Sequence, residues 1–347
     1  MKILIGVQGT GNGHISRCHA LAEALEQRDD IHADYLVSGR SPEKLFDMEI
    51  FGDFQWRQGL SFAVRDGRVS MLDTLSTNPW SQFWSDVRAL DLSSYDLVLT
   101  DFEPVTAWAA RRQKVRSIGM GRQYAFFKAT QALAPNILQR AMVKQFAPCD
   151  TLLGMHWEDI GPHVIPPLIH GAQHAQPSLH KEVLVYLPFE PLSEVTALLN
   201  NFPEYTFVVY HPDAQRAEQG HIQYFPPSRT GFAQAFARAE GVISNAGFET
   251  SSEALARGKK LLVKPLHGQF EQLANARCLQ NRQLASVMDN LSAHHVEHWL
   301  EQDSQVRMEW PDVAPVIAQW LAEGAVESVE SLHRRLWQRT ERIVAVA

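Results

Sequence analysis

The sequence predicts an α/β protein of two domains, in which short strands alternate with helices. Short apolar runs such as Lys2 to Val7 and Thr206 to Tyr210 alternate with longer segments of helical spacing. This alternation is typical of parallel sheets covered by helices. A segment rich in Pro and Gly, Gly161 to Lys181, divides it into two halves. We therefore expect one α/β domain on each side of a linker.

The domain boundaries follow from this division. We place the N-terminal domain at residues 1–165, the linker at 166–181 and the C-terminal domain at 182–326. The last residues, 327–347, have helical spacing and are expected to form a helix over Ser328 to Val346 that packs back on the N-terminal domain. A helix on a membrane surface is the alternative, because arginines lie beside apolar residues in it.

Composition sets limits on the class of protein. With 347 residues, 45% hydrophobic and 20% charged, the chain has globular values and room for two cores. Cys18, Cys149 and Cys278 lie far apart in no metal-binding spacing, which favours buried thiols in a reducing cytosol. No apolar run is long enough to span a membrane, and the first strand is too short for a signal peptide. We expect a cytoplasmic protein.

Basic residues are unevenly placed in a chain of net charge −7. The segment from Pro104 to Cys149 contains no acidic residue and eight basic ones, Arg111, Arg112, Lys114, Arg116, Arg122, Lys128, Arg140 and Lys144. Part of it is predicted as a helix from Ala129 to Phe146. The region 111–144 is either a solvated helix face or a surface for anionic lipid headgroups at the inner face of the membrane, or for a phosphorylated partner. A pI of about 6.1 and the lack of a recognised motif argue against nucleic acid.

A glycine-rich segment follows the first strand. Gly9, Gly11 and Gly13 alternate before a helix predicted from Ile15 to Glu26, so that backbone N–H groups can turn toward an anion. His14 lies at the carboxyl end of this strand, where open parallel sheets bind ligands. An imidazole can accept a proton from a hydroxyl group or from water near neutral pH. His14 is therefore a candidate general base.

Asp101 is the candidate partner of that base. It follows the apolar strand Asp96 to Thr100 and precedes a helix that begins at Pro104. A carboxylate there can orient one ring nitrogen of His14 and stabilise the imidazolium. The alternative is that Asp101 caps the Pro104 helix.

The segment from Gly241 to Gln280 predicts an anion site of the strand-turn-helix kind. A strand at Val242 to Ser244 leads through a tight turn into a helix that ends at Ala256, and a strand from Lys260 to Lys264 follows. Gly247 in the turn indicates a positive φ or a close approach of backbone and ligand. Thr250 and Ser251 can cap the helix, whose free N–H groups and dipole favour phosphate. The alternative is a capping box of Thr250 and Glu253.

These motifs together resemble GT-B glycosyltransferases. The pattern N-A-G-F-x-T-x-x-E, G-K-x-L-L-V-x-P and G-Q-x-E-Q-x-x-N-A is similar to the donor-binding half of the lipid-linked N-acetylglucosaminyltransferases of peptidoglycan synthesis and of the UDP-glycosyltransferases. The opening G-x-G-H-x-x-R resembles the N-terminal motif of the same group, with Gly11, Asn12, Gly13, His14 and Arg17. The resemblance implies two Rossmann-like domains facing across a cleft, with the acceptor on the first and the nucleotide sugar on the second.

The resemblance also assigns roles to residues. Gly247 to Ser251, with Phe248 and Thr250, would hold the donor diphosphate, and Glu253 would accept hydrogen bonds from the ribose. Glu271 and Gln272 would face the transferred sugar, and Phe225 would contact the base. No Asp-x-Asp motif is present, so we expect no metal and no cofactor. The helix N-terminus near Gly247 would instead stabilise the leaving diphosphate.

Three places depart from the pattern. Asn245 and Glu249 stand where many UDP-glycosyltransferases have His and Asn, and Leu187 to Glu190 replaces a Gly/Ser-rich phosphate loop. The expected activity is inverting transfer of a hexosyl or N-acetylhexosaminyl group from a nucleotide diphosphate sugar, with a UDP-sugar favoured, to a hydroxyl acceptor. A lipid-linked or cell-envelope acceptor is one option. The alternatives are hydrolysis of the nucleotide sugar by water and a non-catalytic nucleotide-sugar-binding protein.

Overall fold

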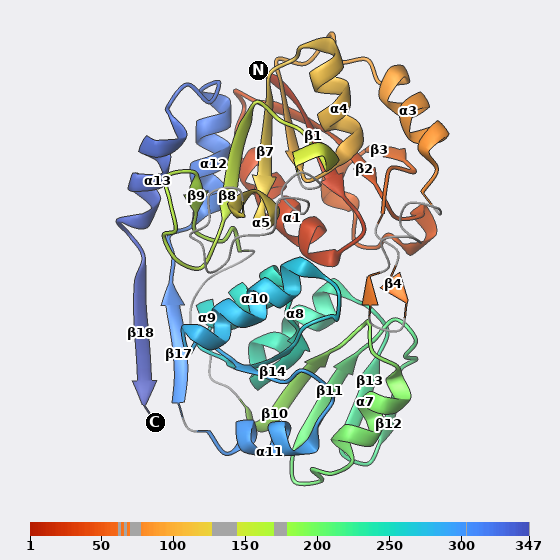
Figure 1. Ribbon diagram of the computed structural model, residues 1–347, viewed down its shortest axis with the longest axis vertical. Coiled ribbons are helices and arrows are strands. Elements are labelled where there is room, and N and C mark those ends of the chain that lie inside the picture. Colours follow the sequence, from red (N-terminus) through yellow and green to blue (C-terminus); the bar gives the residue numbers. More distant parts are fainter. Residues whose placement is uncertain are drawn as a thin grey trace. The chain divides into compact units, whose positions relative to one another are not determined.

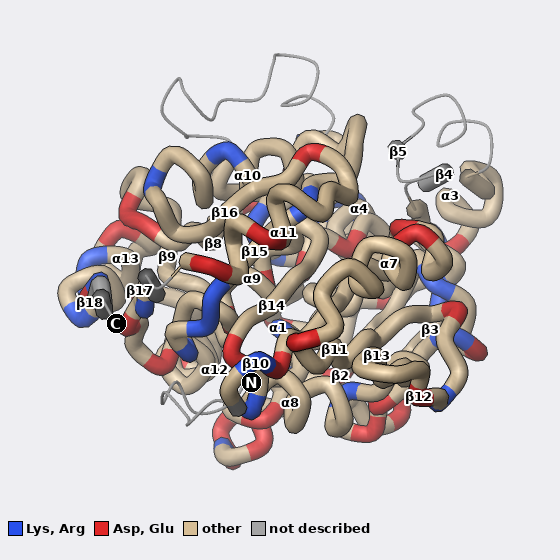
Figure 2. The backbone as a smooth tube through the Cα atoms, turned by 90° about the horizontal axis from the view of Figure 1, so that it is seen from below, with Lys and Arg blue, Asp and Glu red and all other residues tan. Residues whose placement is uncertain are grey.

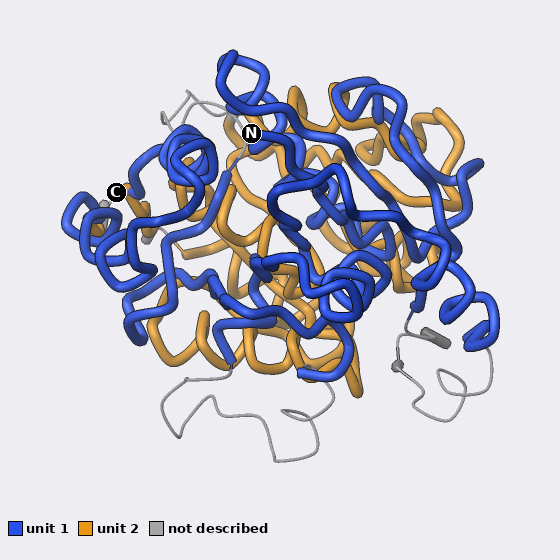
Figure 3. The backbone as a smooth tube through the Cα atoms, turned by 90° about the horizontal axis from the view of Figure 1, so that it is seen from above, with its two compact units in different colours: residues 1–63, 71–171, 310–340 blue, residues 64–70, 172–309, 341–347 orange. Residues whose placement is uncertain are grey.

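The computed structural model describes residues 1–61, 64–65, 68–69, 78–126, 144–169, 179–302 and 304–346. The chain forms two compact units, coloured separately in Figure 3. Unit 1 comprises Met1–Ala63, Met71–Gly171 and Trp310–Thr340, and unit 2 comprises Val64–Ser70, Ala172–Glu309 and Glu341–Ala347. Each unit is built on a 7-stranded sheet with helices, so the predicted α/β class is confirmed.

The sheet of unit 1 has the order β3-β2-β1-β6-β7-β8-β9, and each pair of neighbours is parallel (Figure 1). Its strands are β1 (Lys2–Gln8), β2 (His32–Ser38), β3 (Gln55–Arg57), β6 (Leu97–Asp101), β7 (Ser117–Gly121), β8 (Thr151–Met155) and β9 (Val164–Ile165). Its helices are α1 (Asn12–Glu26), α3 (Trp80–Ala89), α4 (Pro104–Gln113), α5 (Arg122–Ala125), α12 (Val313–Ala322) and α13 (Val329–Trp337), with 3-10 turns at Pro42–Lys44 and Glu49–Phe51. Because the strands are parallel, their carboxyl ends lie at one edge.

Close packing explains the first strand of unit 1. Ile3, Leu4, Ile5 and Val7 are all fully buried, as expected of a strand covered on both faces. A Cβ at Gly6 would lie 2.1 Å from Thr106 Oγ1, so helix α4 approaches β1 closer than any other residue would allow. The position of α4 against β1 therefore depends on this glycine.

The sheet of unit 2 has the order β12-β13-β11-β10-β14-β15-β16 and is parallel except for the β12–β13 pair. Its strands are β10 (Leu179–Tyr186), β11 (Thr206–Tyr210), β12 (Ala217–Gln219), β13 (Ile222–Phe225), β14 (Ala239–Asn245), β15 (Lys260–Lys264) and β16 (Ser286–Val287). Its helices are α7 (Leu192–Leu199), α8 (Arg229–Arg238), α9 (Phe248–Ala256), α10 (Phe270–Asn281) and α11 (Ala293–Leu300). A short hairpin of β4 (Val64–Arg65) and β5 (Arg68–Val69) groups with this unit. Val185, Phe207, Ile243 and Trp299 belong to its core.

The C-terminal part of the chain differs from the prediction. Trp310–Thr340 groups with unit 1, so the expected boundary at residue 326 is wrong. The expected helix from Ser328 to Val346 is also wrong beyond Trp337, because β18 (Glu341–Val346) pairs antiparallel with β17 (Ser304–Glu309). The strand partner is distant in sequence, so local spacing did not reveal it. The helical part, α13, packs on β9 through His333 Nδ1, which donates to the Val164 carbonyl oxygen at 2.7 Å.

The expected linker, 166–181, overlaps the start of β10 at Leu179, and residues 170–178 lie outside the described chain. Helix α1 begins at Asn12, earlier than the Ile15 that was predicted. By contrast β11 and β15 have the predicted bounds.

The basic region is not one charged surface. Arg122 is buried, with its guanidinium 4.4 Å from the ring centre of Phe126, and Arg116 donates to the carbonyl oxygens of Gly324 and Ala325. Figure 2 shows basic and acidic positions interspersed over the described chain. Lys128, Arg140 and the expected helix from Ala129 up to residue 143 lie outside the described residues. None of the described helices is long and apolar enough to cross a membrane.

Candidate active site

His14 and Asp101 meet at the carboxyl edge of the unit 1 sheet. The His14 Nδ1 atom lies 2.7 Å from Asp101 Oδ1. Asp101 is fully buried at the end of β6, whereas the His14 side chain keeps 15% of its surface exposed. Nδ1 is engaged, and Nε2 makes no hydrogen bond to any described residue. The exposed ring nitrogen can therefore receive a proton.

Arg17 completes this cluster from the next turn of α1. Its Nε donates to Asp101 Oδ2 at 2.7 Å and its Nη2 to Oδ1 at 2.5 Å. Burial tends to raise the pKa of Asp101, but the charges of Arg17 and His14 outweigh it and hold the pKa at about 2. Asp101 is therefore ionised at neutral pH.

The capping alternative for Asp101 is wrong, because Glu103 caps helix α4. The Glu103 carboxylate accepts from the backbone N–H of Val105 at 2.8 Å and of Thr106 at 2.7 Å. Phe102, between the two acids, has a left-handed φ of 53°, which reverses the chain locally. The Asp101 carboxylate is therefore available to His14, whereas the Glu103 carboxylate caps the helix.

The glycine-rich segment leads directly into helix α1. Because α1 begins at Asn12, Gly13 is helical, and Asn12 Oδ1 accepts from Arg40 Nη1 at 2.7 Å. Gly9 serves packing, since a Cβ there would lie 2.8 Å from the Ser38 carbonyl oxygen. Gly11 is the N-cap residue of α1. The segment thus serves to place His14 in the first helical turn.

The strand-turn-helix segment of unit 2 leaves a helix N-terminus uncapped. Gly247 is the N-cap residue of α9, with φ −70° and no side-chain cap, so the expected positive φ is wrong. Thr250 and Ser251 lie inside the first turns of α9, and therefore neither caps the helix nor forms a capping box with Glu253. A Cβ at Gly247 would meet no atom within 4 Å. Helix α9 therefore begins beside open space.

Buried polar atoms without partners surround this turn. Ser244 Oγ, Asn245 Oδ1 and Ser251 Oγ are buried and make no hydrogen bond to any residue that the structure describes. Buried polar atoms are nearly always hydrogen-bonded, so such a group indicates a bound polar partner. Together with the positive end of the α9 dipole, the arrangement suits an anion with hydroxyl or phosphate groups.

A buried ion pair that we did not predict lies at the same edge of the unit 2 sheet. Lys264 Nζ lies 2.7 Å from Glu190 Oε1, and Asn245 Nδ2 donates to the Lys264 carbonyl oxygen at 3.0 Å. Lys264 thus neutralises the Glu190 carboxylate in the loop that departs from the family pattern. Glu249, another departure, is buried in the first turn of α9, where the helix dipole favours a negative charge.

The remaining predicted donor residues fall into two groups. The Phe248 ring is buried, and Gln272 Oε1 accepts from the Leu266 N–H at 2.9 Å, so both serve the interior of unit 2. Phe225, Glu253 and Glu271 are partly exposed. Burial raises the pKa of Glu253, against the opposing charges of Arg257 and Arg229. The Phe225 ring stacks on Tyr210 with 5.3 Å between ring centres.

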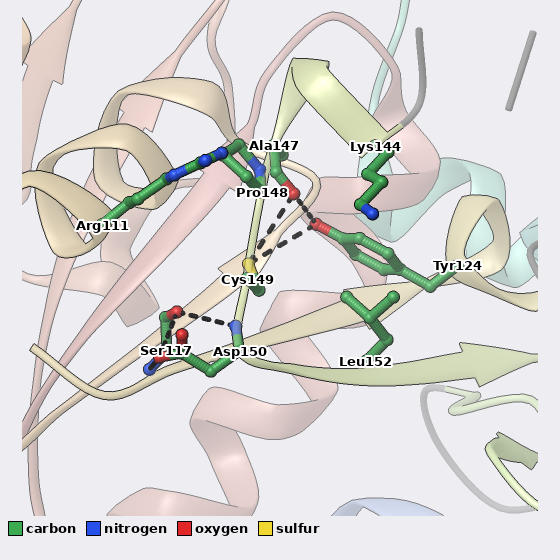
Figure 4. A pocket seen from close by; sticks show the side chains of 9 residues that line it. All are labelled: Arg111, Ser117, Tyr124, Lys144, Ala147, Pro148, Cys149, Asp150 and Leu152. Carbon is green, nitrogen blue, oxygen red and sulfur yellow. Dashed lines mark hydrogen bonds between the residues drawn. The ribbon is translucent and has the colours of Figure 1, made fainter. Parts of the chain in front are cut away.

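A pocket in unit 1 lies away from His14. Arg111, Ser117, Tyr124, Lys144 and Asp150 are among its lining residues (Figure 4). Ser117 and Asp150 lie at the amino ends of β7 and β8, the opposite edge of the sheet from Asp101. Its polar groups also bond to one another, since Ser117 Oγ donates to Asp150 Oδ2 at 3.0 Å. The pocket is not part of the candidate site.

Solved glycosyltransferases share the fold of the whole chain. SnogD of Streptomyces nogalater is 14% identical with a TM-score of 0.55, covering 96% of each chain. SsfS6 of Streptomyces sp. SF2575, complexed with thymidine diphosphate, is 14% identical with a TM-score of 0.56, covering 97% of this chain and 99% of its own. LpCGTa in complex with UDP is 16% identical with a TM-score of 0.57, covering 97% and 98%. The predicted GT-B fold is thereby confirmed.

The fold and the sequence together define a glycosyltransferase. Residues 1–303 match the family described as Glycosyl transferase family 1, and the chain belongs to that family. No curated protein matches the sequence.

Proposed function

We propose that this glycosyltransferase moves a sugar from a nucleotide diphosphate donor to a hydroxyl acceptor, with inversion at the anomeric carbon and His14 as general base. The observation that carries the proposal is the contact of His14 Nδ1 with Asp101 Oδ1 at 2.7 Å. A ring held in this way presents Nε2 to the acceptor and is stabilised when it becomes an imidazolium.

The proposed step is a single displacement. His14 Nε2 takes the proton of the acceptor hydroxyl while its oxygen forms a bond to the anomeric carbon. The bond from that carbon to the diphosphate oxygen breaks, and its electron pair leaves with the nucleoside diphosphate. Attack from the face opposite the leaving group inverts the configuration.

We place the donor on unit 2. The diphosphate would lie at the N-terminus of α9 and accept a hydrogen bond from Ser251 Oγ, with the helix dipole in place of a divalent cation. Glu253 would bind the ribose hydroxyls, Glu271 the sugar and Phe225 the base. UDP and thymidine diphosphate, bound by LpCGTa and SsfS6, are the first two nucleotides to test.

Thermal stabilisation by nucleotides tests the donor site. A ligand at a hundred times its Kd adds about 2.7 kcal/mol to the stability of the protein that binds it. We expect UDP or dTDP to raise the melting temperature more than GDP or CMP does. The Glu253→Ala variant should abolish this increase. Glu194→Ala, an exposed glutamate on α7, is the matched control and should keep the shift. No shift with any nucleotide would contradict the proposed donor site.

Turnover of the donor tests the chemistry. His14→Gln should lower the transfer rate by about 10²–10⁴-fold without lowering nucleotide affinity. Retained transfer in that variant would show that His14 is not the base, and loss of activity with a chelator would contradict metal independence. Release of free sugar in the presence of hydroxyl acceptors, with no transfer product, would establish the hydrolase alternative.

A lipid-linked acceptor is one form of the acceptor to test. Arg111, Arg112, Lys114 and Lys144 are exposed and would contact anionic headgroups at the inner face of the membrane. The fraction of protein that sediments with vesicles of anionic lipid can be compared with the fraction that sediments with vesicles of neutral lipid. Equal sedimentation with both kinds would exclude this peripheral contact.

A further inference from the structure

We infer that Arg17 is a positioning residue for the base: it fixes the Asp101 carboxylate and so places the imidazole proton of His14 on Nδ1. This inference rests on the proposed function in so far as His14 acts as the base. It assigns to Arg17 a role that neither the family match nor the fold gives.

The distances assign the imidazole proton. His14 Nδ1 lies 2.7 Å from Asp101 Oδ1 and 3.0 Å from Arg17 Nη2. An ionised carboxylate only accepts hydrogen bonds and a guanidinium only donates them. Without a proton on Nδ1, the lone pairs of Nδ1 and of Asp101 Oδ1 would repel each other at 2.7 Å. With a proton on Nδ1, this contact is a hydrogen bond. Nη2 then directs its hydrogen to Oδ1, 2.5 Å away. Nε2 is consequently the free acceptor.

Arg17 holds the carboxylate in the one orientation that serves this ring. Its Nε and Nη2 bond to the two different oxygens of Asp101, a forked contact that a lysine cannot reproduce. Cys18 Sγ also donates to Oδ2, at 3.3 Å. Hydrogen bonds to both of its oxygens therefore hold the carboxylate in place.

Other titratable groups near the pair face elsewhere. Glu103 accepts from Ser38 and from the first turn of α4. Tyr124 donates to the Ala147 carbonyl oxygen at 2.9 Å. Cys18 is the remaining titratable neighbour from α1, and its thiol donates to Asp101. Among the described residues, Arg17 is therefore the cation that balances Asp101.

The test compares Arg17→Gln, which removes the forked contact and the charge, with Arg17→Lys, which removes the forked contact alone, and with Arg28→Gln as control. Arg28 pairs with Asp30 beyond the end of the same helix and should behave as the wild type. Imidazole ¹⁵N spectra, with the His14 signals identified by His14→Gln, report the tautomer of His14 in the absence of substrate. The values of kcat and KM report whether the base is correctly placed in the working enzyme.

We expect His14 to carry its proton on Nδ1 in the wild type and in Arg28→Gln, and to show a mixture of the two tautomers in Arg17→Gln. Both Arg17 variants should lower kcat about 10-fold and leave KM unchanged, because each loses the forked contact that holds Asp101. If Arg17→Gln does not fold, Arg17→Lys still decides, because an unchanged tautomer and an unchanged kcat in that variant would contradict a role for the fork. An unchanged tautomer in Arg17→Gln, or a wild-type His14 protonated on Nε2, would overturn the inference. These spectra need no turnover, so they stand even where transfer activity fails to appear.

Discussion

The Lys264 ammonium lies 2.7 Å from the Glu190 carboxylate, and both side chains are more than nine-tenths buried. The two residues come from the end of β15 and from the loop after β10, on either side of Asn245 at the end of β14. Removal of one partner of such a pair lowers the stability of the fold, because the other charge is then buried without a partner or water.

The pair predicts a non-additive effect on stability. Lys264→Met or Glu190→Gln alone should lower the free energy of unfolding by about 3 kcal/mol, whereas the double variant should regain most of that loss. Urea unfolding of the four proteins measures this. Additive losses would show that the two side chains act independently.

The Gly247→Ala variant should lose affinity for the donor nucleotide without losing stability. Gly247 has φ −70° and open space where a Cβ would lie, so alanine should leave the free energy of unfolding unchanged or raise it by a few tenths of a kcal/mol. A bound diphosphate would meet the new methyl group, and we expect about a 10-fold weaker Kd for the donor nucleotide, measured by calorimetry. Gly6→Ala is the contrasting variant, because its Cβ would clash with Thr106 Oγ1 and destabilise the fold. Unchanged affinity in Gly247→Ala would place the diphosphate elsewhere.

Asp101 predicts a dependence of stability on acid pH. Its pKa in the fold is about 2, below the ordinary 3.8, so its stabilising contribution is complete above about pH 4 and is lost as the pH falls through 2. The contribution is about 2 kcal/mol on this difference in pKa. The difference in unfolding free energy between the wild type and Asp101→Asn should therefore shrink from pH 5 to pH 2. Parallel curves over this range would contradict the ionised, paired state of Asp101.

Glu103 predicts a loss of stability through the cap of helix α4. Its carboxylate accepts from Val105 N, Thr106 N and Thr106 Oγ1, and from Ser38 Oγ at 2.6 Å. Glu103→Ala removes the cap and leaves these buried donors unpaired, so we expect a loss of about 2–4 kcal/mol in urea unfolding. His14 should keep its Nδ1–H tautomer in this variant where it folds. A loss below 0.5 kcal/mol would show that water replaces the carboxylate.

The strand bounds could be read from sequence where apolar runs are short and both faces are buried. Thr206–Tyr210 and Lys260–Lys264 are of this kind. The starts of α1 and α9 could not, because Gly11 and Gly247 act as N-cap residues without a side-chain signal. The segment Glu341–Val346 was assigned to a helix because its partner, Ser304–Glu309, is remote in sequence. Local spacing gives no information about such pairing.

The sequence by itself determined the α/β class and the glycosyltransferase family, and it paired His14 with Asp101 as a prediction. It placed His14 before the helix, whereas α1 begins at Asn12 and carries His14 and Arg17 three positions apart, on one helix face. Only the tertiary structure showed that Arg17 shares Asp101 with His14. Asp101 lies 84 positions from Arg17 along the chain, and the turn at Phe102 directs Asp101 and Glu103 to different partners. In the same way, Glu190 and Lys264 are 74 positions apart, and the strand order of the sheet brings them together. Contacts over such separations depend on which strands become neighbours, and that is a property of the packed core.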